Sequence, residues 1–153
     1  MSDISLDQLI SHRAPMSLLS RFVSADNDSA VCEVEIKKSS AFFDLSRGGV
    51  PTYIGIEYIA QTIATFAGAL AMKSGEEVKI GFLLGTRKLS LNESYFKVDK
   101  TYRVNVKQLY LEDSGLAVFE TTVSDADKVI VSGNINTFQP ENVKQFLEDE
   151  QSD

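Results

Sequence analysis

The longest apolar run of the chain covers residues 53–72 (YIGIEYIAQTIATFAGALAM) and contains one charged residue, Glu57. Apolar residues on all sides of a helix predict a helix that is buried all round. Pro51 before the run and Ser74–Gly75 after it are typical start and stop signals. The sequence therefore predicts one long core helix between these two signals.

A glutamate in such a helix needs a physical explanation, because a buried carboxylate is costly unless it is paired, hydrogen-bonded or protonated. We interpret Glu57 as a functional group. Gln61 lies four residues later on the same helical face, where its amide can hydrogen-bond the carboxyl or a molecule bound to it. The alternative is a structural glutamate that reaches the edge of the core.

The same run is long enough to cross a bilayer. However, a glutamate inside a membrane is costly, and the segments on both sides have strand patterns. Residues 1–13 also lack the apolar core of a signal peptide. We therefore expect no membrane span.

Alternating polar and apolar residues predict strands on both sides of the helix. Two strands precede it, at 16–25 and 30–37, and a polar turn at Asp26–Ser29 joins them. Four strands follow it, at 79–91, 100–112, 115–125 and 129–139. Residues 41–51 are expected to be irregular, and short helices are expected at 5–10 and 141–150.

This order of elements predicts an α+β architecture, in which an antiparallel sheet curls around one long apolar helix. Such a sheet covers most of the helix but leaves one flank and one sheet edge open. A dimer that covers both is the expected completion.

Composition narrows the class of partner. A chain of 153 residues suits a single domain, 1–153, with a core over 8–140 and an acidic C-terminal tail. The net charge of −7 and the scattered basic residues argue against a nucleic-acid partner.

Cys32 is the only cysteine, which excludes an internal disulfide and favours a cytoplasmic location. We expect Cys32 to be a core residue of a strand, and one cysteine with one histidine cannot form a structural zinc site.

Two motifs at a characteristic separation carry a family resemblance. LISHRAPMSLLSRF at 9–22 resembles the LPHRxPFLLVDR segment of FabZ-type 3-hydroxyacyl-acyl-carrier-protein dehydratases, and VPTYIGIEYIAQTIATFAG at 50–68 resembles their MPGVLxxEAxAQ helix. With FFD at 42–44 and IGFLLGTRK at 80–88, the chain looks closest to the ApeP-like branch, which is associated with aryl-polyene lipid synthesis. The resemblance implies a hotdog fold, a catalytic Glu57 and a site glutamine at Gln61.

One departure from the family pattern is important. FabZ-type enzymes carry a histidine fourteen residues before the glutamate, and this chain has Phe43 there. Dehydration removes a proton from the α-carbon and protonates the departing β-hydroxyl, so a base is needed beside the acid. Asp44 is next to the vacant position, and His12 is a candidate if the N-terminal segment reaches the site. A histidine from a partner subunit is the third candidate, since the histidine and glutamate of one family site come from different subunits.

The resemblance also implies how the substrate is bound. Backbone amides at Gly48 and Gly49, and the helix start after Pro51, are expected to stabilise the developing charge on the thioester oxygen. The expected substrate-binding residues are Gln61, Gly48, Gly49, Tyr53, Ile54, Ile56, Phe82 and Leu84.

The resulting hypothesis is a dehydratase that acts on 3-hydroxyacyl chains carried on the phosphopantetheine of an acyl carrier protein, with no metal or other cofactor. The expected partners are the carrier protein and either a second copy or another hotdog dehydratase subunit. Two alternatives remain: a hotdog thioesterase, in which the helix carboxylate activates water, and a non-catalytic subunit that binds acyl chains or stabilises a partner.

Overall fold

The computed structural model describes residues 17–76 and 82–139. The short helices expected at 5–10 and 141–150, and the candidate base His12, lie outside the described residues. The elements follow the chain in this order: β1 Arg21–Ala25, β2 Ser29–Glu35, β3 Gly49–Pro51, the short 3-10 helix η1 Thr52–Ile54, α2 Gly55–Ser74, β4 Phe82–Leu91, β5 Tyr95–Lys97, β6 Thr101–Leu111, β7 Leu116–Asp125 and β8 Lys128–Phe138.

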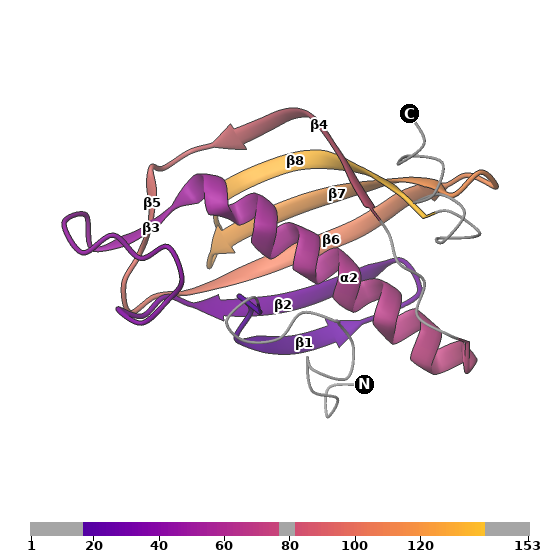
Figure 1. Ribbon diagram of the computed structural model, residues 1–153, viewed down its shortest axis with the longest axis horizontal. Coiled ribbons are helices and arrows are strands. Elements are labelled where there is room, and N and C mark those ends of the chain that lie inside the picture. Colours follow the sequence, from indigo (N-terminus) through magenta and orange to yellow (C-terminus); the bar gives the residue numbers. More distant parts are fainter. Residues whose placement is uncertain (1–16, 77–81, 140–153) are drawn as a thin grey trace, which may run out of the picture.

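Six antiparallel strands form one sheet in the order β1-β2-β6-β7-β8-β4, and α2 packs along its inner face (Figure 1). The pairs β1–β2, β6–β7 and β7–β8 are hairpins, whereas β2–β6 and β4–β8 pair strands that are separated in sequence. The expected α+β architecture with one long helix on an antiparallel sheet is confirmed. The two outer strands are β1 and β4.

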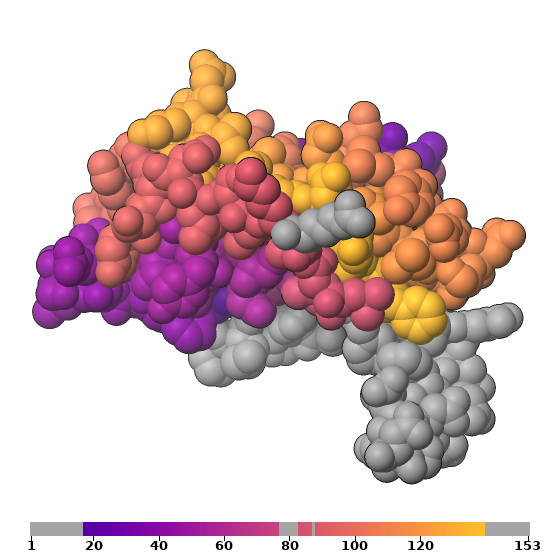
Figure 2. Space-filling model, turned by 90° about the horizontal axis from the view of Figure 1, so that it is seen from above, coloured from indigo at the N-terminus to yellow at the C-terminus, as the bar shows by residue number. Residues whose placement is uncertain are grey.

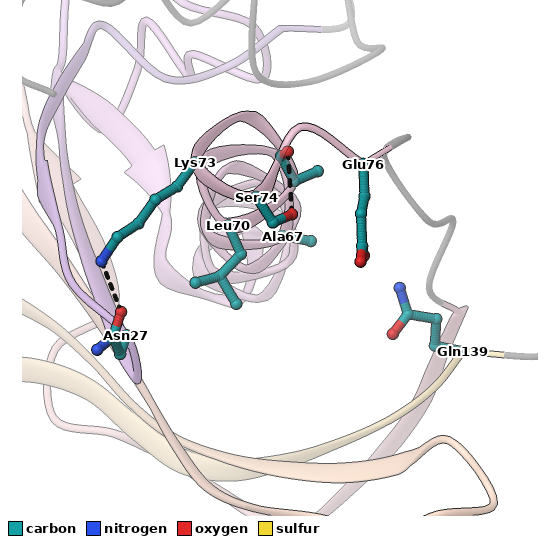
Figure 3. Close-up of a pocket in the computed structure, with 8 residues that line it drawn as sticks. Asn27, Ala67, Leu70, Lys73, Ser74, Glu76 and Gln139 are labelled. Atoms are coloured by element: carbon teal, nitrogen blue, oxygen red, sulfur yellow. Dashed lines mark hydrogen bonds between the residues drawn. The ribbon is translucent and has the colours of Figure 1, made fainter.

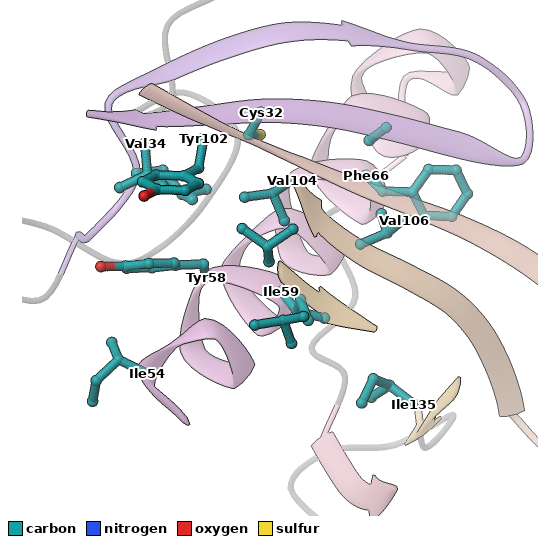
Figure 4. Close-up of a cluster of buried hydrophobic side chains, with 14 of the residues drawn as sticks. Cys32, Val34, Ile54, Tyr58, Ile59, Phe66, Tyr102, Val104, Val106 and Ile135 are labelled. Carbon is teal, nitrogen blue, oxygen red and sulfur yellow. The ribbon is translucent and has the colours of Figure 1, made fainter. Parts of the chain in front are cut away.

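The core lies between α2 and the sheet (Figure 4). Tyr58, Ile59 and Phe66 extend from the helix toward the strands. In the first half of β6, the alternate residues Tyr102, Val104 and Val106 are buried in the same core, as the alternation predicts. The Phe66 and Phe119 rings meet edge to face with centroids 5.6 Å apart. Cys32 is fully buried in β2, as expected for a core residue.

A second sheet of two short strands, β3 and β5, lies at the start of the helix. This sheet was not predicted, because residues 41–51 were expected to be irregular. Gly49 explains the close pairing: a Cβ at this position would lie 2.1 Å from the carbonyl oxygen of Phe96 in β5. Thr52 also links the helix start to the segment before β5, since its Oγ1 donates a 2.6 Å hydrogen bond to the carbonyl of Glu93. These contacts fix where α2 begins.

The far end of α2 is defined by Gly75, which has a φ of 75° and whose N–H bonds the carbonyl of Ala71. This left-handed residue ends the helix as the sequence predicts. Within the described part of the chain, the stretch Thr52–Ser74 is long and apolar enough to cross a membrane, but 56% of its most apolar window is buried in the fold. This is the burial of a core helix.

One face of α2 is left uncovered by the sheet, as expected for the open flank of the helix. Ile56, Ala60, Ile63, Ala64 and Ala67 are only half-buried. The physical reason is that a single curled sheet encloses a helix from one side only, so residues at i, i+4 and i+7 opposite the sheet stay uncovered.

Candidate active site

Glu57 lies on the uncovered face of α2, and its side chain is exposed in the single chain. Tyr53, one turn earlier, is 62% exposed. Figure 2 shows the purple and magenta atoms of the preceding loop and of α2 at the surface next to β4. The carboxyl is therefore set in an apolar helix face that is open to solvent, whereas the sequence predicted a buried environment for it.

Gln61 has the opposite environment, although it lies only one turn from Glu57. It is 2% exposed, and its Oε1 accepts a 2.8 Å hydrogen bond from the backbone N–H of Leu18. This bond ties the helix to the segment before β1. Gln61 thus has a structural function, and its predicted contact with substrate stays a prediction.

Asp44 organises a tight turn between β2 and β3. Its Oδ1 accepts hydrogen bonds from Ser46 N at 3.0 Å and Ser46 Oγ at 2.7 Å. The Ser46 hydrogen bond is the main reason why the pKa of Asp44 lies below its usual range. A carboxylate held in this way is a weaker base, so the structure favours the turn interpretation of Asp44 over the catalytic one.

The amides of Gly48 and Gly49 are used inside the same turn. Both N–H groups point to the carbonyl oxygen of Asp44, at 2.9 and 3.4 Å. Gly48 has a φ of +69°, which closes the turn. The expectation that these two amides are exposed donors for a thioester oxygen is therefore wrong for this structure, because the turn already binds them.

The expected acyl-lining residues separate into different environments. Ile54 is 8% exposed and belongs to the core, so it does not face a substrate in this structure. Ile56 is half-buried on the helix, and Leu84 is 58% exposed on β4. Phe82 begins β4, opposite Phe138. Tyr53 and Leu84, which are exposed, and the half-buried Ile56 are candidates for substrate or subunit contact.

Two features were not expected from the sequence. A cavity of about 460 Å³ lies at the C-terminal end of α2, away from Glu57. In the loop before β3, Phe42 adopts a φ of +67° and is 61% exposed, with Leu45 79% exposed beside it in sequence. The only signal for such a loop was its lack of periodicity, which does not indicate which side chains point outward.

We also considered a nucleophilic cysteine and a metal site. Burial raises the pKa of the Cys32 thiol to about 11, which disfavours a nucleophilic thiolate. Among the residues that the structure describes, no three His, Cys, Asp or Glu side chains are grouped to hold a metal ion.

A long apolar helix enclosed by a curled antiparallel sheet defines the hotdog class of proteins. Within this class, the family model for ApeP dehydratase matches residues 4–148. The chain belongs to the ApeP-like dehydratase family.

Solved structures agree with this assignment. The dehydratase heterocomplex ApeI:P from Xenorhabdus doucetiae contains a chain with 27% identity and a TM-score of 0.85, over 95% of this chain and 96% of that one. A hypothetical thioesterase with coenzyme A from Streptococcus pneumoniae shares the fold at 10% identity and a TM-score of 0.62, over 79% of this chain and 88% of that one. No curated protein sequence matches the chain.

Proposed function

We propose that this chain is the glutamate-bearing half of a two-chain 3-hydroxyacyl-acyl-carrier-protein dehydratase, which forms a trans-2-enoyl thioester in fatty-acid or aryl-polyene-type lipid synthesis. One observation carries the proposal. Glu57 is presented on the uncovered face of α2, whereas Phe43 occupies the position at which FabZ-type enzymes have their histidine.

In this proposal the two proton transfers are divided between two chains. A histidine of the partner removes the α-proton of the 3-hydroxyacyl thioester, and the neutral Glu57 carboxyl protonates the β-hydroxyl, which leaves as water. A subunit that covers the α2 face would exclude water from Glu57, and a desolvated carboxyl favours its neutral form. The chain's own residues thus supply the acid and part of the apolar wall.

The environment of Asp44, another candidate base, supports a partner histidine. Asp44 accepts a hydrogen bond from Ser46, and its pKa is lowered, so it is a weak base. The dehydratase heterocomplex among the structural relatives is evidence that a chain of this family assembles with a second dehydratase. The hotdog partner that we propose here carries the family histidine.

The carrier protein remains part of the proposal. An acyl carrier protein is acidic, and Lys38 and Arg47 are exposed at the two ends of the loop before β3. Both lie on the chain segment that leads to α2, so a carrier docked there would direct its phosphopantetheine arm toward the start of the helix. No metal or other cofactor is required, because the thioester itself acidifies the α-proton.

Product analysis tests the reaction. The chain is co-expressed with a hotdog dehydratase that carries the family histidine, and the complex is incubated with a 3-hydroxyacyl thioester of acyl carrier protein. The proposal expects an enoyl thioester with no free thiol. Release of free thiol would identify a thioesterase instead, and activity of the partner that is unchanged by this chain would identify a non-catalytic subunit.

A further inference from the structure

The two ends of α2 are held in different ways. At the C-terminal end, Ser74 Oγ donates a 3.2 Å hydrogen bond to the carbonyl of Ala71 (Figure 3). In the same turn, Lys73 Nζ donates a 2.9 Å hydrogen bond to Asn27 Oδ1, between β1 and β2. At the other end, no side-chain hydrogen bond from a described residue caps α2 or the short helix η1 before it. An uncapped helix start depends on packing against the rest of the fold.

Glu57 lies in this uncapped first turn. Its carboxylate makes no hydrogen bond or ion pair within the part of the chain that the structure describes. The position of the carboxyl therefore follows the backbone of the first turn, and only the torsions of its own side chain can adjust it. A general acid has to come within hydrogen-bond distance of the group that it protonates. Whatever holds the first turn of α2 therefore also determines where the carboxyl can act.

Phe96 of β5 packs against this turn and is fully buried. A Cβ added to Gly55 would lie 3.3 Å from Phe96 Cζ, so the ring lies close to the backbone of the residue at which α2 begins. The ring also contacts Tyr58, with centroids 5.5 Å apart and planes inclined at 42°. Because Gly55 and Tyr58 precede and follow Glu57, one aromatic side chain supports the turn on both sides of the carboxylate in sequence.

Phe96 is itself fixed by its neighbours in the core. Its ring meets Tyr102 of β6 edge to face, with centroids 4.9 Å apart, and Tyr58 and Tyr102 extend into the same part of the core (Figure 4). The Lys97 N–H donates a 2.8 Å hydrogen bond to Tyr102 Oη, and the Phe96 backbone pairs with Val50 of β3. The ring therefore connects the first turn of α2 to two strands that cannot shift independently of it.

We propose that Phe96 is a positioning residue for the dehydration, which holds the first turn of α2 where the Glu57 carboxyl reaches the β-hydroxyl. The proposal rests on the proposed function, because it takes Glu57 as the acid. Phe96 has no contact with the substrate in this account. A misplacement of reacting groups by about 1 Å can cost about 100-fold in rate, so loss of the ring is expected to lower kcat and to leave substrate binding unchanged.

Phe96→Leu tests this assignment in the complex with the partner subunit. We expect kcat to fall at least about tenfold and KM to stay within about twofold. Phe119→Leu is the matched control, because Phe119 is 3% exposed and packs edge to face on Phe66, about 14 Å along the helix from Glu57. Both variants lose one buried ring and should show similar falls in melting temperature. Equal kcat values for the two variants would overturn the inference.

Gly55→Ala disturbs the same contact without removing a ring. The backbone of Gly55 is helical, with φ −54° and ψ −28°, so alanine is compatible with it. Its Cβ would lie 3.1 Å from Val131 Cγ2 and 3.3 Å from Phe96 Cζ, which requires a shift of a few tenths of an ångström. We expect kcat to fall at least about threefold with KM unchanged. If Phe96→Leu does not fold, full kcat in Gly55→Ala would overturn the inference.

Tyr58→Phe separates the packing of the ring from the chemistry of its hydroxyl group. Tyr58 is 2% exposed, and its hydroxyl has no hydrogen-bond partner among the described residues. The variant keeps the ring that packs on Phe96, so kcat is expected to stay within about twofold of the wild type. A tenfold loss would show that the hydroxyl matters to the reaction and would contradict an account based on packing.

Hydrogen exchange of the chain alone keeps the inference separate from the reaction. The amides of residues 59–61 donate to the carbonyls of residues 55–57 in the i→i−4 pattern, so their exchange reports opening of the first turn. We expect Phe96→Leu to speed this exchange at least about tenfold, and Phe119→Leu to leave it within about twofold. Unchanged exchange in Phe96→Leu would overturn the inference even if dehydration is confirmed. An inactive wild-type complex would instead refute the proposed function, so the two failures are distinguishable.

Discussion

Glu57 and Gln61 differ by one helical turn, yet the fold gives them opposite environments. Gln61 is 2% exposed and bonds the Leu18 amide, whereas Glu57 is exposed on the open face. The periodicity of the sequence placed both on one side of the helix. It could not show that residues before β1 cover Gln61, because that contact joins segments far apart in the chain.

Substitution of Glu57 by Gln tests the acid function. The variant keeps the size of the side chain but removes its titratable proton, so kcat of the complex is expected to fall at least about 100-fold. The fold should be unaffected, since surface substitutions change stability by less than about 0.5 kcal/mol. Glu120→Gln on β7, also exposed, is the matched control and should keep full activity. A similar kcat for both variants would contradict the assignment.

At the level of elements, the sequence predicted the helix and the six-stranded sheet well. Their hydrophobic periods are local, and turn residues mark their ends, as at Asp26 and Gly75. The β3–β5 sheet was not predicted, because each strand has only three residues, which are too few to show an alternation of polar and apolar residues. The cavity could not be predicted because its lining combines the end of α2 with Asn27 and Gln139, which are far apart in the chain.

Two adjacent glycines test how the β3–β5 sheet positions the helix. Gly49→Ala would place a Cβ 2.1 Å from the Phe96 carbonyl oxygen, so it is expected to lower the free energy of unfolding by at least about 3 kcal/mol. At Gly48 an added Cβ meets no atom within 4 Å, but the backbone has a positive φ. Gly48→Ala is therefore expected to lower the free energy of unfolding by only about 1–2 kcal/mol. Urea denaturation measures both values. Equal losses would show that the close strand approach is not the cause.

Glu33 joins three strands and makes their stability depend on pH. Its carboxylate accepts a 2.6 Å hydrogen bond from Arg21 of β1 and a 3.2 Å bond from Arg103 of β6. The Arg21 bond is the largest cause of the lowered pKa of Glu33. Because the folded pKa is the lower one, the stabilisation is complete above the unfolded pKa of about 4.3. It is lost as the pH falls through the folded value.

Glu33→Gln is therefore expected to be less stable than the wild type at neutral pH and to approach it as the pH falls below 4. Urea denaturation at neutral and acidic pH measures this convergence. A stability difference that is constant with pH would contradict the ion-pair account.

For the whole molecule, the open α2 face and the outer strand β4 expose apolar side chains on the side where a second subunit is proposed. Leu84 and Leu91 of β4 are 58% and 44% exposed, and exposed apolar side chains along an outer strand suit a protein interface. Leu84→Glu is expected to leave the chain folded and to weaken association with the partner at least tenfold, as measured by light scattering. Leu109→Glu, at a 45% exposed position on β6, should not weaken it. Equal association of the two variants would place the interface elsewhere.

The central claim is that Glu57 catalyses dehydration only in a site completed by a partner histidine. The most direct measurement compares enoyl-thioester formation by the purified chain, by the histidine-bearing partner, and by the two together, with wild-type chain and with Glu57→Gln. We predict that the wild-type mixture is active, and that the chain alone and the Glu57→Gln mixture are at least about 100-fold slower. A pure chain that dehydrates the substrate at the full rate of the mixture would contradict the account.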